Sequence, residues 1–228
     1  MKLLLLSDVE EKGLWDYWTP DKTDAYDLII SCGDLSADYL EYLTTAANKP
    51  LLYVRGNHDH HYDVHPPMGC IDIDDTVYNF HGLRILGLGG SMRYHSGKDM
   101  YTEKQMSKRI RHMEGMLRFT GGFDLLVSHA PCLGYGDGED LAHRGFACFN
   151  DLLTRWGPKY MAYGHVHASY GAPFKREIIH PAGTKLINAY DRYSLDLSED
   201  DYPKEGQTGS LFYDLYIRRT HHLSSRSR

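Results

Sequence analysis

Short apolar runs recur along the chain, and polar turn residues follow each of them. Continuous runs of about four to eight apolar residues are typical of strands covered on both faces. The runs of this kind are residues 2–6, 27–32, 51–54, 123–127 and 159–162. Between the second and third runs, Ser36 stands in capping position before apolar residues at helical spacing through residue 47. The pattern predicts a β-α-β unit.

The remaining pattern adds antiparallel strands and further helices. Residues 77–80 and 83–88 flank a two-residue connection, His81 and Gly82, which predicts a hairpin. Helical spacing covers residues 103–119 and 148–156, and apolar runs predict closing strands at 177–180, 185–189 and 211–217. We therefore expect an α/β fold in which helices cover mixed sheets.

The chain is long enough for one substantial core, and its composition shifts nowhere sharply. We expect a single domain over residues 1–219 of the 228. The acidic, turn-rich segment 196–209 and the C-terminal segment 220–228 are expected to be mobile.

The charge and composition exclude several classes of protein. A net charge of -6 and a pI of about 6.1 argue against binding of extended nucleic acid, which needs a basic excess. A local basic rim could still hold one anionic substrate. No apolar stretch approaches the roughly 20 residues that cross a bilayer, and residues 1–6 are too short for a signal-peptide core. We expect a cytoplasmic protein without a membrane partner.

The four cysteines form neither a zinc cluster nor a disulfide framework. Cys32, Cys70, Cys132 and Cys148 are far apart and include no CxxC pair, so we expect reduced thiols. Cys32 lies within an apolar run and is expected in the core.

Potential metal ligands stand directly after the predicted strands. Because ligands bind at the carboxyl ends of strands in open α/β sheets, side chains far apart in sequence can meet there. Carboxylates suit hard cations and imidazoles suit zinc, iron, nickel and manganese, so this mixture favours a pair of divalent ions. Two ions about 3.5 to 4 Å apart can clamp a phosphoryl group and hold a hydroxide for in-line attack. The candidate ligands are Asp8, Asp34, Asn57, His129, His165 and His167.

Each candidate taken alone has an ordinary structural alternative. Asp8 could cap a turn, Asp34 could belong to a turn before the helix, and residues 58–61 could form a solvated loop. His165 and His167 alternate on one side of an extended segment, which favours a shared metal site over unrelated surface histidines. The ordered set is more specific than any member.

Five motifs follow one another along the chain: Asp8, Gly33 with Asp34, Gly-Asn-His-Asp at 56–59, Ser-His-Ala-Pro at 128–131, and Gly-His-Val-His at 164–167. In this order and spacing the chain resembles the calcineurin-like metallophosphoesterase superfamily. The resemblance implies two mixed β-sheets packed as a sandwich and flanked by α-helices, a four-layer arrangement with a dimetal site at one rim.

The resemblance also implies a role for each matched position. Asp8, Asp34 and His167 would hold one metal. Asp34, Asn57, His129 and His165 would hold the other, so that Asp34 bridges two divalent ions of manganese, iron, nickel or zinc. His58 would stabilise the transition state or protonate the leaving oxygen, and Asp59 would orient its loop.

Glu10 departs from the superfamily pattern, which usually has histidine two residues after the first aspartate. A carboxylate here could ligate the first metal and favour manganese, magnesium or iron over zinc. Alternatively, Glu10 points to solvent and the first metal site is weak.

Contacts to the substrate are less defined by the sequence. Asn57, Arg93 and Arg144 are the candidate substrate-binding residues, because the last two lie in glycine-containing segments that could approach a phosphate. Both segments could equally be structural turns. Trp15, Tyr17 and Trp18 could stack on a nucleobase or could pack in the core, and Asn188 is expected to be structural.

These patterns predict a phosphoesterase that hydrolyses a phosphomonoester or phosphodiester by attack of metal-activated hydroxide. The expected substrate is a small phosphoester or a nucleotide. One alternative is a protein-interaction scaffold with a weakened metal site, which Glu10 favours. The other is a nuclease, which the acidic net charge disfavours.

Overall fold

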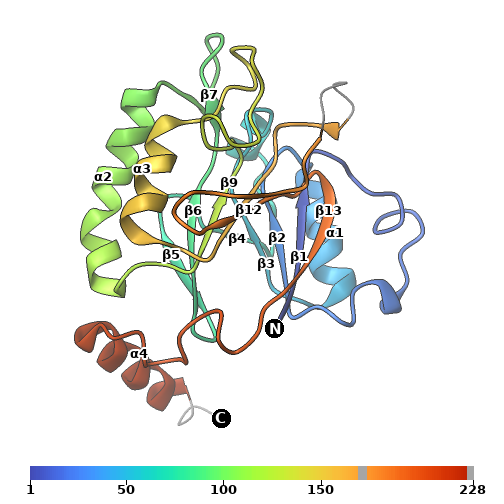
Figure 1. Ribbon diagram of the computed structural model, residues 1–228. Coiled ribbons are helices and arrows are strands. Elements are labelled where there is room, and N and C mark those ends of the chain that lie inside the picture. The colour runs from blue at the N-terminus through green and yellow to red at the C-terminus, as the bar shows by residue number, and fades with distance from the viewer. Residues whose placement is uncertain (169–173, 225–228) are drawn as a thin grey trace.

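Two mixed β-sheets pack face to face in the computed structural model, and helices cover their outer faces (Figure 1). The structure describes residues 1–168 and 174–224, with side chains described as far as residue 219. The first sheet contains, in spatial order, β13 (Asp191–Asp196), β1 (Lys2–Ser7), β2 (Leu28–Ser31), β3 (Leu51–Tyr53) and β4 (Ile71–Asp72). The second contains β11 (Glu177–Ile179), β12 (Lys185–Asn188), β10 (Tyr160–Tyr163), β9 (Leu125–Ser128), β6 (Leu83–Leu88) and β5 (Val77–Phe80).

The inner strands of both sheets run parallel, and the outer pairs include antiparallel ones. β1, β2, β3 and β4 are parallel neighbours, as are β6, β9, β10 and β12. β13, β5 and β11 each run antiparallel to their neighbour. A small parallel pair, β7 (Ser91–Met92) and β8 (Met100–Tyr101), stands apart from both sheets. The carboxyl ends of the parallel strands therefore meet at one rim, which is uppermost in Figure 1.

The helices surround the two sheets, and the C-terminal one packs against another helix rather than on the face of a sheet (Figure 1). They are α1 (Ala37–Ala47), α2 (Glu103–Thr120), α3 (Ala147–Trp156) and α4 (Leu211–Ser224), with short 3-10 turns η1 (Pro20–Lys22) and η2 (His60–Asp63). α1 covers the first sheet, and α2 with α3 covers the second (Figure 1). α1 begins where the Ser36 side chain accepts from the Tyr39 amide, and α2 begins at a capping box of Thr102 and Gln105.

Three apolar layers hold this arrangement together. Leu3 and Leu5 of β1 face the second sheet, whereas Leu4 and Leu6 face α1, and all four are at most 1% exposed. A third layer joins the second sheet to α2 and α3. Each fully buried leucine contributes roughly 1.5 to 3 kcal/mol relative to an exposed one. The layers confirm the predicted helix–sheet–sheet–helix order.

In the C-terminal region one sequence-based expectation is wrong and one strand was missed. Residues 211–217, predicted as a strand, belong to α4, because Tyr213 and Ile217 are four residues apart and bury one helical face. β13 was not predicted, because its residues alternate between half-buried and exposed and include few apolar side chains. Of segment 220–228, residues 220–224 continue α4 and the rest lie outside the described residues. Within the part of the chain that the structure describes, no helix has the length and hydropathy to span a bilayer.

Candidate metal centre

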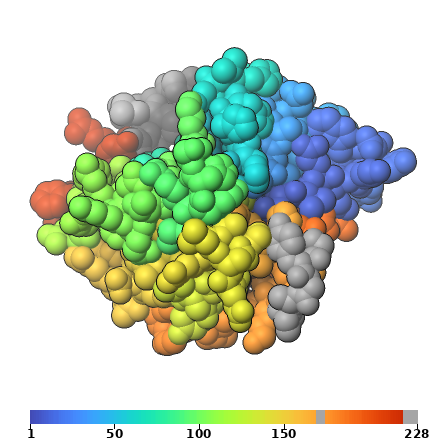
Figure 2. Space-filling view, turned by 90° about the horizontal axis from the view of Figure 1, so that it is seen from above, coloured from blue at the N-terminus to red at the C-terminus, as the bar shows by residue number. Residues whose placement is uncertain are grey.

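The candidate ligands lie at the rim where the parallel strands end. Asp8 follows β1, Asp34 follows β2, His129 follows β9 and His165 follows β10. Asp8, Asp34 and His165 have φ angles of 66°, 58° and 68°, a left-handed conformation that is rarely adopted by residues other than glycine. Strained backbone of this kind clusters at functional sites. Figure 2 looks down on the rim, where the blue and cyan N-terminal part meets green and yellow loops.

Glycines before the ligands permit a close approach of the loops. A Cβ at Gly56 would lie 2.0 Å from Asp34 Oδ1, and a Cβ at Gly164 would lie 2.7 Å from Asp8 Oδ2. Any larger side chain would displace these carboxylates. Steric crowding therefore explains why glycine stands at these two positions of the sequence motifs.

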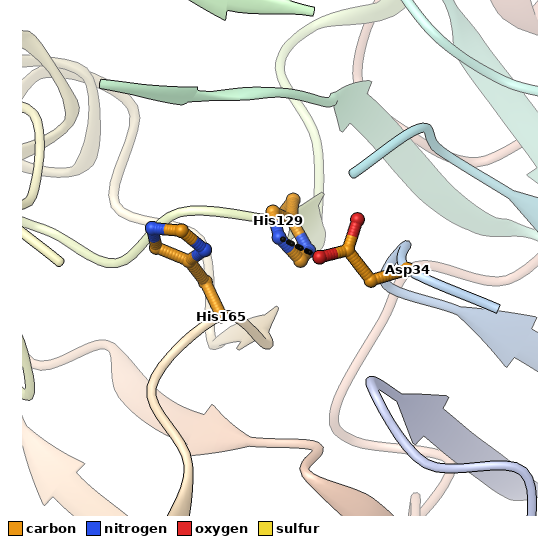
Figure 3. A group of neighbouring side chains, drawn as sticks. All are labelled: Asp34, His129 and His165. Carbon is orange, nitrogen blue, oxygen red and sulfur yellow. Dashed lines mark ion pairs between the residues drawn. The ribbon is translucent and has the colours of Figure 1, made fainter. Parts of the chain in front are cut away.

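One cluster joins the two halves of the chain. His129 Nε2 lies 3.3 Å from Asp34 Oδ2 and 3.1 Å from Asn57 Oδ1. Ligand atoms of Asp34, His129 and His165 all lie within 4.8 Å of one another, and Figure 3 shows Asp34 and His129 pointing toward each other. Side chains that follow strands of both sheets therefore lie together at this rim.

Hydrogen bonds to backbone carbonyls fix the direction of both imidazoles. His129 Nδ1 donates to the Cys32 carbonyl at 2.8 Å, which leaves Nε2 to face the oxygens of Asp34 and Asn57. His165 Nε2 donates to the Ala142 carbonyl at 2.6 Å, which leaves Nδ1 free for a ligand. Metal-binding histidines characteristically donate their other ring N–H in this way.

The space between Asp34 and His129 favours a positive charge. Burial lowers the pKa of His129, but the Asp34 carboxylate outweighs burial and raises it to about 10. Burial raises the pKa of Asp34, but His129 and the His58 amide outweigh it and hold the pKa well below its usual range. Burial and the neighbouring His129 charge lower the pKa of His165 to about 4. A cation between Asp34 and His129 would take the place of the shared proton.

A second pair of ligand groups lies beside this cluster. His167 Nε2 lies 3.2 Å from Asp8 Oδ1, and the Asp8 side chain is only 1% exposed. The His165 amide donates to both Asp8 oxygens, at 3.2 and 3.0 Å. The donor set of carboxylates, imidazoles and one amide oxygen fits two adjacent divalent cations.

His58 and Asp59 occupy different positions in their loop. His58 is 72% exposed, with Nε2 4.0 Å from Asp34 Oδ2, so its ring can reach a ligand above the cluster. Asp59 is buried, and its Oδ2 accepts from the amides of Asp34 and Gly56 at 2.8 and 2.7 Å. Burial and the Asp34 charge raise the pKa of Asp59 to about 7.

The remaining candidates lie farther from the cluster or have other partners. Glu10 Oε1 accepts from the Ser36 amide at 3.0 Å, at the start of α1. Arg93 donates to the Met100 carbonyl, and Arg144 is exposed. Neither arginine is brought to the ligand cluster by a contact among the described residues.

The aromatic residues near the N-terminus do not form one stacking surface. Trp15 packs on Tyr39 with ring centroids 5.3 Å apart, Tyr17 is exposed, and Trp18 Nε1 donates to Thr23. Trp15 thus takes the packing role that the sequence left open.

Two positioning contacts were not predicted for these residues. Asn57 Nδ2 donates to the Tyr94 hydroxyl at 3.3 Å, which turns Oδ1 toward His129. Asn188 was expected to be structural, and its Nδ2 donates to the Val166 carbonyl at 2.8 Å between the two loop histidines. The carbonyls of Cys32 and Ala142 carry no sequence signal, because any residue supplies one.

Comparisons with known proteins agree with this geometry. A family model described as the calcineurin-like phosphoesterase superfamily domain matches residues 1–189. The UPF0046 protein C25E10.12 of Caenorhabditis elegans is 30% identical over 138 residues, covering 56% of this chain and 47% of that protein. The UPF0046 protein T07D4.2 of the same organism is 26% identical over 160 residues, covering 67% and 37%. The chain therefore spans half or less of the length of these curated relatives.

Solved structures share the fold at low sequence identity. TT1561 of Thermus thermophilus aligns with a TM-score of 0.57 and 15% identity, covering 83% of this chain and 89% of that one. Phosphopantetheinyl hydrolase of Mycobacterium tuberculosis aligns with a TM-score of 0.53 and 15% identity, covering 83% and 88%. Because the family model matches most of the chain, and the candidate ligands lie together at one rim, the chain belongs to the calcineurin-like phosphoesterase superfamily.

Proposed function

We propose that the protein is a metal-dependent phosphoesterase that hydrolyses a small phosphomonoester or phosphodiester, a nucleotide being one such substrate. The observation that carries the proposal is the orientation of His129 and His165. Each ring donates one N–H to a backbone carbonyl and turns its other nitrogen toward carboxylate or amide oxygens. Burying carboxylates and these ring nitrogens together has a large electrostatic cost unless a cation between them compensates it.

Six side chains are the proposed metal ligands. Asp8, Asp34 and His167 would hold one divalent ion, and Asp34, Asn57, His129 and His165 would hold the second. Bound there, a pair of divalent ions supplies Lewis acidity toward the phosphoryl oxygens and activates water as the nucleophile. The mixed nitrogen and oxygen donors suit manganese, iron, nickel or zinc.

His58 acts on the substrate in this proposal. Its exposure and its 4.0 Å distance from Asp34 place the ring above the ligand cluster rather than within it. From there Nε2 can donate a proton to the leaving oxygen, or a hydrogen bond to the phosphoryl oxygens. Asp59 holds the loop beneath it through the two backbone amides.

Two further observations bear on the class and place of action. The structural neighbour named phosphopantetheinyl hydrolase supports phosphoester hydrolysis as the reaction class, while its low identity leaves the substrate of this chain to be measured. All four cysteines are unpaired, which supports our proposal that the protein acts in the reducing cytoplasm.

The test combines metal content with turnover. We expect manganese-loaded protein to hydrolyse p-nitrophenyl phosphate or bis-p-nitrophenyl phosphate, and His58→Ala to keep its metal while kcat falls about 10²- to 10⁴-fold. His112→Ala, at an exposed position on α2, is the matched control. An unchanged rate in His58→Ala would contradict the assigned role.

A non-catalytic scaffold is the second candidate, and the position of Glu10 favours it. The Glu10 carboxylate accepts a hydrogen bond from the backbone amide at the start of α1. Glu10 therefore adds no ligand to the first metal site. Failure of the wild-type protein to bind metal or to hydrolyse either ester would favour the scaffold. Cleavage of plasmid DNA at a rate exceeding that of the small esters would favour a nuclease.

A further inference from the structure

A cleft of about 940 Å³ opens beside the candidate metal centre, between the glycine-rich loop 134–143 and segment 174–178. We refer to it as the loop cleft. His167 and His143 line it, and the His143 ring lies 5.3 Å from the ring of His165, measured between centroids. The loop cleft therefore reaches the metal ligands themselves. Its volume is typical of small-molecule sites and far exceeds the space that a phosphate group needs.

The wall formed by the glycine-rich loop is acidic. Asp137, Glu139 and Asp140 line the loop cleft, and Lys175 is the one lysine or arginine among its described lining residues. Asp137 accepts from the amides of Gly134 and Gly145, at 2.9 and 3.2 Å.

Asp140 and Glu139 complete this negative wall. Asp140 accepts from His143 Nδ1 at 2.8 Å, and this hydrogen bond lowers the pKa of Asp140. Glu139 is exposed. The three carboxylates give the loop cleft a negative charge at neutral pH that one lysine does not balance.

The same cleft has aromatic and aliphatic surface. Tyr135, Phe174 and Ile178 line it. The Phe174 ring lies under the Arg176 guanidinium at 4.9 Å, and Arg176 is itself held by the carbonyls of Asn188 and Tyr190. The Phe174 ring also lies 6.2 Å from the Tyr190 ring, and these two contacts restrict its orientation, which lowers the conformational entropy lost when it contacts a flat organic group.

We propose that the loop cleft binds the organic substituent of the phosphoester and discriminates against a substituent that carries a second phosphate. The proposal rests on the proposed function, because the metal centre fixes the first phosphate at one end of the cleft. The favoured substituent is flat and either uncharged or cationic.

The size of the discrimination follows from the charges. A second phosphate brings close to two negative charges at pH 7 into a cleft with a net excess of two carboxylates. Like charges about 8 Å apart near a protein surface repel enough to change binding several-fold per pair. After allowance for solvent screening, we expect about a tenfold preference for the uncharged substituent.

The experiment measures competition at low ionic strength. Inhibition constants of AMP, adenosine 3′,5′-bisphosphate and inorganic phosphate are determined against hydrolysis of a p-nitrophenyl ester. Whichever phosphate of the bisphosphate lies at the metals, the other accompanies the adenosine. We expect wild-type protein to bind AMP about tenfold more tightly than the bisphosphate, and more tightly than phosphate.

Two charge reversals test the source of the preference. Glu139→Lys should bring the ratio of the AMP and bisphosphate constants to about two or less. Glu199→Lys is the control, because it makes the same charge change far from the loop cleft. Glu199 follows Asp196, which pairs with Lys2 at the end of β1 opposite the metal centre. This variant should keep the wild-type ratio. Phe174→Ala should weaken AMP binding at least fivefold and by a larger factor than phosphate binding.

The outcomes that overturn the proposal are a wild-type ratio near one, tighter binding of the bisphosphate, or equal ratios in the two charge-reversal variants. If no p-nitrophenyl ester is hydrolysed, the proposed function fails separately. Equilibrium dialysis of the same three ligands with the manganese-loaded proteins then gives the same ratio without turnover, and that ratio decides the proposal.

Discussion

Asp59 offers a sharp test of how the ligand loops are held. Its buried carboxylate joins two of them, because Oδ2 accepts from the amide of Asp34 and from the amide of Gly56. Asp59→Ala would leave both amides without this partner. Each lost hydrogen bond to a buried carboxylate costs about 1.5 to 3 kcal/mol. We therefore expect the free energy of unfolding to fall by about 3 to 5 kcal/mol, which a domain of this size can tolerate.

The conservative variant separates the hydrogen bonds from the charge. Burial and the Asp34 charge raise the pKa of Asp59 to about 7, so a neutral side chain of the same shape should be accepted. The carbonyl oxygen of Asp59→Asn can accept from both amides, and we expect a loss of only about 1 kcal/mol. Because Asp59 positions the backbone of Asp34, the proposed bridging ligand, Asp59→Ala should also weaken metal binding about 10- to 100-fold.

Urea unfolding and manganese titration measure the two effects. With a slope of about 2 kcal/mol per molar urea, the midpoint for Asp59→Ala should drop by about 2 M. Asp63→Ala removes an exposed carboxylate from the same loop and serves as the control. The reasoning is refuted if Asp59→Asn is as unstable as Asp59→Ala, or if Asp59→Ala binds manganese as wild type does.

Three further variants test separate contacts. Glu10→Ala should leave manganese affinity unchanged, because the Glu10 carboxylate caps α1. The free energy of unfolding should fall by at most about 1 kcal/mol. A tenfold loss of manganese affinity would instead show that Glu10 ligates a metal. Arg84→Met should lower the free energy of unfolding by about 3 to 5 kcal/mol, measured by urea unfolding. The reason is that the buried guanidinium donates to Asp124 and to the carbonyls of Thr120 and Gly121. A loss below about 1 kcal/mol would contradict this reasoning. Asn188→Ala should lower manganese affinity in calorimetric titration, because it releases the Val166 carbonyl between His165 and His167. Unchanged affinity would show that this hydrogen bond does not position the two histidines.

The sequence indicated where the candidate ligands come together, because these residues follow buried strands. An apolar run such as residues 2–6 can be read as a strand, and parallel strands bring their carboxyl ends to one rim. The convergence of Asp34, Asn57 and His129 follows from that topology.

The features that the sequence did not predict depend on packing rather than local pattern. The apolar run at 211–217 fits either a strand or a helix face, and only burial of Tyr213 and Ile217 decides between them. The partner of Glu10 could not be predicted, because it is a backbone amide whose position depends on the start of α1. The contact of Tyr94 with Asn57 likewise joins loops whose relative positions no local pattern encodes.

In the proposed function, two cations would share the Asp34 carboxylate. Electron paramagnetic resonance of protein reconstituted with manganese tests it most directly, because two Mn²⁺ ions joined by a bridging carboxylate give an exchange-coupled spectrum. We expect two tightly bound ions per chain with that coupled signal in the wild type, and its loss in Asp34→Asn. A spectrum of isolated Mn²⁺ ions alone, or the same coupled signal in Asp34→Asn, would contradict the account.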